Sequence, residues 1–188
     1  MLAEIRLIHV NEYHQMAEAG ILDSDERVEL IDGQIYNMAA KGTAHSAAIV
    51  RTDRILRELL GTRALIRLQD PIRLNDYSEP EPDVAIVQID PLDYADHHPT
   101  VSEVFLVIEV ADTTLRRDCQ FKANVYARAG IADYWVVDVT ARQLYVFRAP
   151  QPDGYQNQLV LLDDGTIAPL HFPEVTIAVA NLLPKISG

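Results

Sequence analysis

The chain has 188 residues, of which 48% are hydrophobic and 23% are charged, and its formal net charge is −12. This length and composition are typical of one globular domain with a sizeable core, so we expect a single domain over residues 1–188. The acidic total argues against a protein that holds duplex DNA by a basic surface alone. It is compatible with a nuclease whose carboxylates bind metal ions.

Three further features indicate where the protein works. The single cysteine excludes an internal disulfide framework and favours a reducing compartment. Residues 1–13 lack a basic segment followed by a long apolar run, so we expect no signal peptide. No apolar stretch approaches the length of about 20 residues that a membrane-spanning helix needs. The sequence therefore predicts a soluble, cytoplasmic protein with no membrane partner.

Turn and cap residues divide the first third of the chain into a short helix, a β-hairpin and a long helix. Asn11 is a suitable N-cap for the short helix, and Asp32-Gly33 is typical of a two-residue hairpin turn. Glu29 shares a strand face with Ile31, and a half-exposed strand glutamate is the simplest interpretation from spacing alone. We expect these elements at residues 12–18 (helix), 27–31 and 34–38 (strands) and 44–60 (helix).

The long helix carries two kinds of candidate substrate contact. Arginines recur at every third position and form a row of cations at Arg51, Arg54 and Arg57. Such a row usually faces solvent, and contact with phosphate is the less common alternative. His45 lies in the first turn, where a histidine is more often structural, and we keep it as a candidate substrate contact.

Proline residues mark the limits of the next strands. Residues 64–74 are expected to be extended but interrupted at Pro71, because a central strand does not tolerate proline. Pro82 precedes an apolar strand at 83–87 and leaves Asp83 at its start. An aspartate after proline is usually a turn residue, so Asp83 gains interest only from the other acids.

The loop at residues 91–100 contains two adjacent histidines, His97 and His98. Adjacent side chains on an extended chain point apart, and no third ligand has a suitable spacing. We therefore expect no zinc site here.

The centre of the chain predicts a strand, a helix and a second strand. Residues 104–110 form an apolar run rich in β-branched side chains, which is typical of a strand covered on both faces. A helix is expected at 115–129, ending at Gly130, and a second buried strand at 131–139. Such a unit packs as a right-handed crossover when its strands are parallel.

Two charged residues of this unit occupy positions that should be apolar. Glu109 lies inside the first strand, where a bare carboxylate needs a cation, a metal ion or a hydrogen-bond partner. On the helix, Lys122 shares a face with Cys119, Tyr126 and Ala129, and the Tyr126 hydroxyl is expected to orient it. The coincidence of a buried carboxylate and a lysine on the facing helix is the main indication of a functional site.

The rest of the chain predicts β-structure and an apolar closing segment. We expect a strand at 143–148, a turn at 150–154, a hairpin of 157–162 with 166–170, and a closing segment at 175–183.

Glu29, Asp83, Glu109 and Lys122 form a set that suits phosphodiester hydrolysis. Carboxylates on adjacent strands can hold a hard divalent ion such as Mg²⁺. A nearby lysine can orient or deprotonate a water molecule, and the metal offsets charge on a phosphoryl oxygen. Arg116 and Arg117 open the helix, where backbone N–H groups favour anions, so we expect them to contact substrate phosphate.

The sequence resembles the Uma-type endonucleases, a large bacterial family in the PD-(D/E)XK restriction-endonuclease-like superfamily. The resemblance covers nearly the whole chain, and its most specific segments are PEPDVAIV, VIEVADTTLRRD and KANVYARAGIADYWVVD. It implies a restriction-endonuclease-like fold of the mixed α/β (α+β) class. This is a mixed β-sheet flanked by helices, with additional β-hairpins.

The resemblance also implies roles for individual residues. Asp83 and Glu109 match the metal-binding acids of the superfamily, and Glu29 matches an additional acid from the first core element. The usual lysine position, two residues after the second acid, is Ala111 here. The resemblance therefore implies that the lysine has moved to the helix, at Lys122.

Together these considerations predict a homodimeric, Mg²⁺-dependent (or Mn²⁺-dependent) endonuclease that hydrolyses phosphodiester bonds of nucleic acid, with DNA as the expected substrate. One alternative is a catalytically inactive binding or regulatory module, in which Lys122 and Glu109 form a buried ion pair. Another is a hydrolase of a different phosphoester. The sequence shows no zinc finger, aromatic platform or strongly basic arm, so it gives no indication of base recognition.

Overall fold

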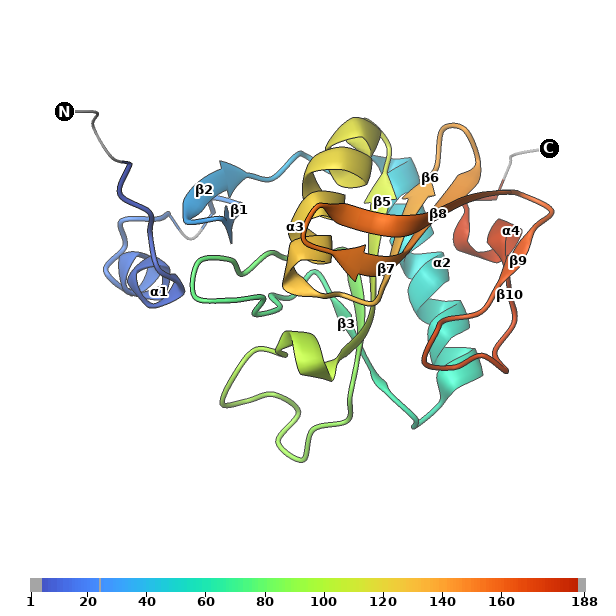
Figure 1. Ribbon diagram of the computed structural model, residues 1–188, viewed down its shortest axis with the longest axis horizontal. Coiled ribbons are helices and arrows are strands. Elements are labelled where there is room, and N and C mark those ends of the chain that lie inside the picture. The colour runs from blue at the N-terminus through green and yellow to red at the C-terminus, as the bar shows by residue number, and fades with distance from the viewer. Residues whose placement is uncertain (1–4, 24, 186–188) are drawn as a thin grey trace.

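A six-stranded mixed sheet forms the centre of the protein (Figure 1). The computed structural model describes residues 5–23 and 25–185, so residues 1–4 of the segment inspected for a signal peptide lie outside it. The strand order is β3 (Leu65–Leu68), β4 (Val84–Val87), β5 (Val104–Ala111), β6 (Asp133–Asp138), β7 (Gln143–Gln151) and β8 (Gly154–Leu162). Only β5 and β6 pair in parallel within this sheet. The predicted mixed sheet is confirmed.

The predicted strand–helix–strand unit is also confirmed. Every residue of β6 is buried, and in β5 only Phe105 is partly exposed, as expected for strands covered on both faces. The connecting helix α3 (Ala123–Ala129) ends at Gly130, whose φ of 92° is left-handed. A π-helical segment, η2 (Arg117–Lys122), precedes α3. Its periodicity differs from the regular helix that we expected, and π-turns recur at functional sites.

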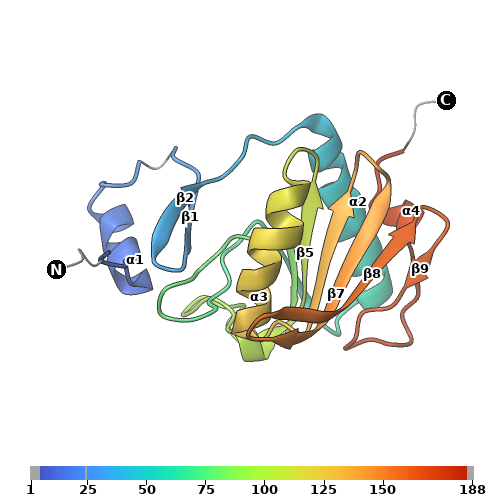
Figure 2. The same ribbon diagram turned by 45° about the horizontal axis from the view of Figure 1, so that its top comes forward.

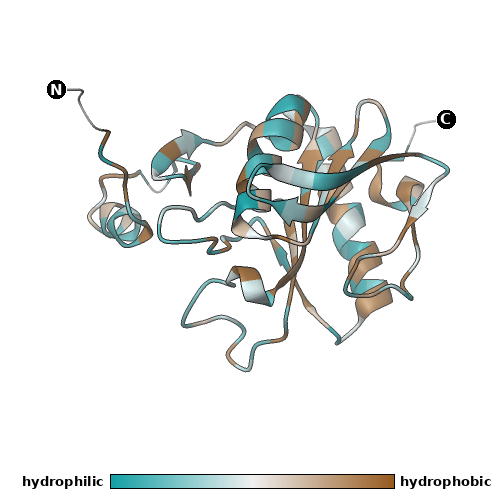
Figure 3. Cartoon of the chain, viewed as in Figure 1, coloured by the Kyte–Doolittle hydropathy of each residue, from teal (hydrophilic) through white to brown (hydrophobic). Residues whose placement is uncertain are grey.

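Helices cover both faces of the sheet (Figure 2). The long helix α2 (Thr43–Leu60) packs on the face that includes Ile108, and α3 packs on the other, where Tyr126 joins Val107 in the core. The central strands between them are largely hydrophobic (Figure 3). Because side chains alternate along a strand, Glu109 shares the face of Val107 and points toward α3. The two layers therefore set a carboxylate against a helix.

The predicted hairpin is formed by β1 (Val28–Ile31) and β2 (Gln34–Asn37), which pair antiparallel. Its two turn residues, Asp32 and Gly33, have positive φ angles of 49° and 72°. These angles match the two-residue turn that Asp-Gly favours.

We expect Gly33→Ala to destabilise the protein more than Gly20→Ala does. A Cβ at Gly33 would lie 2.5 Å from the Leu7 Cβ and 3.1 Å from the Ile8 nitrogen, whereas a Cβ at Gly20 meets nothing within 4 Å. Both glycines have positive φ, so Gly20→Ala measures the backbone strain alone, about 1 kcal/mol. The clash adds about 1–3 kcal/mol at Gly33. Urea unfolding of both variants tests the difference, and equal losses would contradict it.

The expectation that Glu29 is half exposed is wrong. All residues of β1 are buried, and Glu29 is only 1% exposed. The cause is tertiary, because Leu30 is bridged to Glu79 in the segment that leads to β4. Side chains from η2 cover Glu29 as well, and spacing within the strand could not reveal either contact.

The cap predicted for the first helix is also wrong. Helix α1 (Val10–Glu18) begins before Asn11, and His9 is its N-cap. The Glu12 carboxylate accepts a hydrogen bond from the His9 backbone N–H at 3.0 Å. This contact is part of a capping box, in which the Glu12 side chain pairs with the N-cap backbone and defines the start of the helix.

The C-terminal strands pair differently from the prediction. The expected hairpin of 157–162 with 166–170 is wrong, because β8 pairs along its length with β7. The turn expected at 150–154 is shorter, since β7 and β8 extend into it, and Tyr155 of β8 packs on Phe147 of β7. The remaining elements are β9 (Thr166–Ile167), which pairs with β10 (Ile177–Ala178), the short helix α4 (Val179–Leu182) and the 3₁₀ turn η1 (Val101–Glu103). Among residues 5–23 and 25–185, no helix is long and apolar enough to span a membrane.

Candidate active site

Glu109 and Lys122, which the sequence marks as out of place, meet in the interior. The Lys122 Nζ lies 2.9 Å from the Glu109 Oε1, and the Tyr126 hydroxyl donates to the same oxygen at 2.9 Å. Both side chains are buried, since Glu109 is 4% exposed and Lys122 is 5% exposed. Tyr126 therefore orients the carboxylate, rather than the lysine as we expected.

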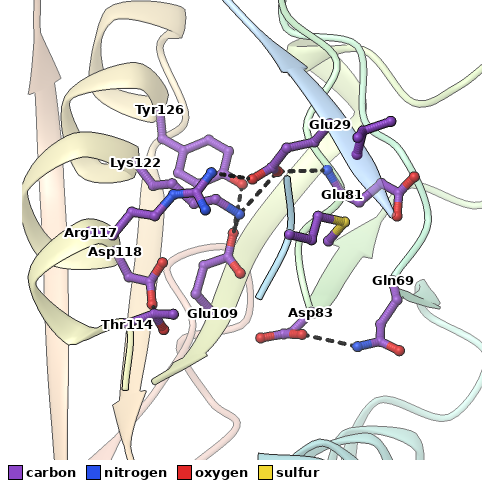
Figure 4. Close-up of polar contacts among 12 residues, drawn as sticks. Glu29, Gln69, Glu81, Asp83, Glu109, Thr114, Arg117, Asp118, Lys122 and Tyr126 are labelled. Carbon is purple, nitrogen blue, oxygen red and sulfur yellow. Dashed lines mark hydrogen bonds and ion pairs between the residues drawn. The ribbon is translucent and has the colours of Figure 1, made fainter. Parts of the chain in front are cut away.

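Glu29 completes this cluster from the hairpin (Figure 4). Its Oε2 lies 3.1 Å from the Lys122 Nζ, and its Oε1 accepts a hydrogen bond from the Arg117 Nη2 at 3.0 Å. The backbone N–H of Glu81 also donates to Oε2, at 3.4 Å. Both oxygens of Glu29 thus have cationic partners, and Lys122 bridges two buried carboxylates.

Asp83 is held beside Glu109 by the backbone of β5. Its Oδ2 accepts a hydrogen bond from the Val110 N–H at 2.9 Å, and Gln69 donates to Oδ1 at 3.1 Å. His45, at the entry of α2, places its Nε2 2.9 Å from Oδ2. Burial alone would raise the pKa of Asp83, but these hydrogen bonds outweigh burial and lower the pKa. Asp83 is therefore ionised at neutral pH.

Glu109 is in the opposite electrostatic situation. Burial raises its pKa to about 8, and the charges of Asp83, Asp118 and Glu29 add to this increase against the opposing effect of Lys122. For Lys122, burial favours the neutral amine, but Glu109 and Glu29 outweigh it and raise the pKa. Lys122 is thus an ammonium, and the site has more acids than cations to match them. An additional positive charge near Glu109 would be stabilised here.

These groups line one pocket of about 350 Å³. Of the predicted site residues, Glu29, Asp83, Glu109, Lys122, His45 and Arg117 line it, and Arg116 does not. Arg116 is exposed and donates to the Gln120 side chain at 3.2 Å. The structure therefore brings together six of the seven residues that the sequence selected.

The arginine row of α2 does not line this pocket. Arg57 donates to Asp53 at 2.7 Å, and Arg51 donates to the carbonyl of Ala180 at 3.3 Å. Two of the three cations therefore have partners in the fold, which favours the structural interpretation of the row.

Sequence reasoning gave no site role to several polar residues that line the pocket. The Thr114 hydroxyl donates to Asp118, whose pKa is raised by burial. Lys41 also lines the pocket, and burial lowers its pKa. Lys41 precedes the glycine at the entry of α2, and this position beside a helix start is the one signal that could have indicated it.

The fold and the pocket together define a restriction-endonuclease-like protein, and comparisons with known proteins agree. The chain belongs to the Uma2 family, described as "Putative restriction endonuclease", whose model matches residues 10–180. The resemblance noted in the sequence is confirmed.

A crystal structure of "a putative nuclease belonging to DUF820" from Anabaena variabilis ATCC 29413 has the same fold. The TM-score is 0.68 at 16% sequence identity, over 93% of this chain and 97% of that chain. No curated protein matches the sequence. Family and fold support a nuclease-like function.

Proposed function

We propose that this protein is a Mg²⁺-dependent endonuclease that hydrolyses phosphodiester bonds of DNA, with Asp83, Glu109 and Lys122 as its catalytic residues. The observation that carries the proposal is the shared pocket, in which two strand carboxylates lie beside a buried lysine. Restriction-endonuclease-like enzymes generally use divalent metal ions, so the fit of such an ion to these residues is the first question.

The donor set fits a hard divalent ion. Asp83 is ionised, and Glu109 uses only Oε1 for its hydrogen bonds to described residues, which leaves Oε2 for a ligand in the pocket. Carboxylate oxygens are the ligands that Mg²⁺ prefers. Both oxygens of Glu29 are occupied by cations, so Glu29 assists by holding Lys122 and joins the metal ligands only if that contact opens. When bound, Mg²⁺ would offset negative charge on a phosphoryl oxygen.

Lys122 is a donor rather than a base in this proposal. Because its pKa is raised, its ammonium group cannot accept the proton of an attacking water molecule. It instead orients that water and stabilises charge on the phosphate. His45 acts through Asp83, which it keeps ionised and oriented.

Cations around the pocket supply the phosphate contacts. Arg117 and Lys41 line the pocket, and Arg116 lies on the exposed side of the same helical turn as Arg117. A polymer extends beyond a pocket of about 350 Å³, so the phosphates next to the scissile one would reach Arg116. The few cations agree with moderate, salt-sensitive binding of nucleic acid.

Cleavage of supercoiled plasmid and of single-stranded DNA, with Mg²⁺ or Mn²⁺, tests the proposal. The wild type should cut at least one substrate, chelator should stop it, and Asp83→Asn should be inactive. An Asp83→Asn variant with full activity would refute the site. Absence of cleavage by the wild type on either substrate would refute the nuclease.

A second function, a binding or regulatory module, is favoured by one observation. Lys122 contacts Glu109 and Glu29 at 2.9 and 3.1 Å, so the charged groups form a closed set. Such a closed set would not respond to metal ions, whereas a metal site would be stabilised by Mn²⁺. A hydrolase of another phosphoester would share the metal response and differ only in the substrate that it cleaves.

We expect the affinity for Mn²⁺ to rise with pH up to about 8. Glu109 has a pKa of about 8, so at pH 7 it carries a proton that a metal ion must displace. Affinity should therefore increase about tenfold per pH unit between pH 6 and 8, and then level off. Isothermal titration calorimetry at pH 6, 7, 8 and 9 measures this slope. Glu109→Gln should abolish the slope, and a flat wild-type profile would contradict the prediction.

We also propose that the protein is a homodimer that pairs through the outer edge of β8. This nine-residue strand ends the sheet, and Leu159, Val160 and Leu162 are about half exposed on it, at 49%, 48% and 58%. Exposed, apolar edge strands tend to pair. Light scattering should give twice the chain mass, and Val160→Lys should give a monomer. A monomeric wild type would refute the dimer.

A further inference from the structure

Three segments far apart in the sequence bring metal-ligating side chains together away from the catalytic pocket. His14 lies on α1, Glu79 lies between β3 and β4, and His98 lies in the loop before β5. One ligand atom from each lies within 4.8 Å of the other two. The residues that line the adjoining hollow, of about 420 Å³, include none that line the catalytic pocket.

The contacts within this group leave binding capacity unused. The His14 Nε2 lies 2.5 Å from the Glu79 Oε1, and the His14 and His98 rings meet edge to face with centroids 6.1 Å apart. The His98 Nδ1 is buried and has no hydrogen-bond partner among the described residues. Glu79 is itself a buried carboxylate, 3% exposed. Buried polar atoms in folded proteins normally have a hydrogen-bond partner, so the unpartnered His98 nitrogen near the buried Glu79 carboxylate is unusual.

We propose that His14, Glu79 and His98 bind Zn²⁺. Two imidazoles and one carboxylate are a donor set that zinc accepts, and three protein ligands leave the fourth position for water. Ligand atoms at about 2.1 Å from a tetrahedral ion lie about 3.4 Å apart. Small side-chain rotations reach this spacing from the observed limit of 4.8 Å. The ion would also supply the partner that the His98 ring lacks.

A neighbouring arginine determines which oxygen of Glu79 is available to bind the metal ion. The Arg73 Nη1 lies 3.7 Å from the Glu79 Oε2, on the oxygen that does not face His14. The carboxylate therefore binds through Oε1 alone, and Arg73 holds its other oxygen. Two neutral imidazoles and one carboxylate would carry a single negative charge against the two positive charges of the ion.

The adjacent histidine, His97, is excluded from this site. Its Nδ1 lies 2.6 Å from Asp96 and its Nε2 lies 3.3 Å from Glu103. The two neighbouring side chains thus make separate contacts, as the sequence predicts for an extended chain. The sequence argument against zinc considered only nearby ligands, whereas His14 and Glu79 come from other segments.

A metal ion here would be structural. It would tie α1 and the loop at 91–100 to the segment that continues through Glu81 to Asp83. The inference does not depend on the proposed nuclease function, because the two sites share no ligand.

Metal titration of the full chain, after removal of metal by a chelator, tests the proposal. The visible absorption of tetrahedral Co²⁺ should saturate at one equivalent per chain, because the oxygen ligands of the catalytic pocket do not give this absorption, and Zn²⁺ should displace the absorbing ion. Zn²⁺ should also raise the melting temperature by about 5 °C. His14→Ala and His98→Gln should each weaken Co²⁺ binding at least tenfold. The His97→Ala control should bind as the wild type does.

Glu109→Gln separates the two sites in the same titration. The variant should keep the Co²⁺ absorption while it loses cleavage. Absence of stoichiometric Co²⁺ binding by the folded wild type would overturn the zinc site, as would equal binding by His14→Ala and His98→Gln. Circular dichroism of the metal-free variants establishes that they are folded, so that lost binding reports the ligands.

Discussion

Glu109→Gln is expected to reduce DNA cleavage about 10³-fold or more while the fold keeps its stability. Glutamine retains an acceptor oxygen for the hydrogen bonds from Lys122 and Tyr126, which anchor Oε1 at 2.9 Å each. It removes the negative charge that would bind the metal ion. Because burial raises the pKa of Glu109 to about 8, the wild-type side chain is neutral at pH 7 in the metal-free protein. The substitution therefore changes little in that state.

Two measurements test this separation of activity from stability. Plasmid cleavage with Mn²⁺ gives the rate, and urea unfolding at pH 7 should place the variant within about 1 kcal/mol of the wild type. Glu58→Gln, which changes an exposed glutamate on α2, is the matched control and should alter neither. Undiminished cleavage by Glu109→Gln would remove Glu109 from the active site.

Local sequence patterns predicted most of the fold, because these elements depend on residues that are close together in the sequence. The apolar run before Ala111, the helix stop at Gly130 and the Asp32-Gly33 turn each follow from backbone preferences of a few residues. The second hairpin failed for the same reason. That prediction rested on the turn residues after Leu162. In the structure, β8 pairs instead with β7. Turn residues do not indicate which neighbouring strand a segment will pair with.

Some residues of the candidate site could likewise be predicted from local patterns, whereas others depend on contacts between distant segments. Glu109 and Lys122 could be found because each breaks the apolar pattern of its own element. Glu29 was undervalued, because its burial comes from Arg117 and Lys122 on a distant helix. The role of His45 as a partner of Asp83 likewise depends on a contact across 38 positions of the chain. The π-helical turn at η2 has no marker in the periodicity of the sequence.

Lys122→Met should produce a loss of stability that grows with pH. The substitution leaves Glu109 and Glu29 buried without their shared cation, and the pKa of Glu109, about 8 in the presence of that cation, then rises further. The folded variant therefore keeps the proton of Glu109 to a higher pH than the folded wild type does, whereas both unfolded chains release it at the same pH. The loss of unfolding free energy relative to the wild type therefore grows as pH rises above about 8, and it is complete above the pKa of Glu109 in the variant.

The size of the effect follows from removing one partner of a buried ion pair, which costs about 3–5 kcal/mol. We expect the stability deficit of Lys122→Met to be smaller at pH 7 than at pH 9, where it should approach this amount, and cleavage to be lowered about 10²-fold or more. Urea unfolding at both pH values measures the difference. Lys41→Met, which changes a partly exposed pocket lysine, controls for loss of positive charge and should show no such pH dependence. A deficit of equal size at pH 7 and pH 9 would contradict this electrostatic role of Lys122 and would show that its side chain contributes to stability through packing alone.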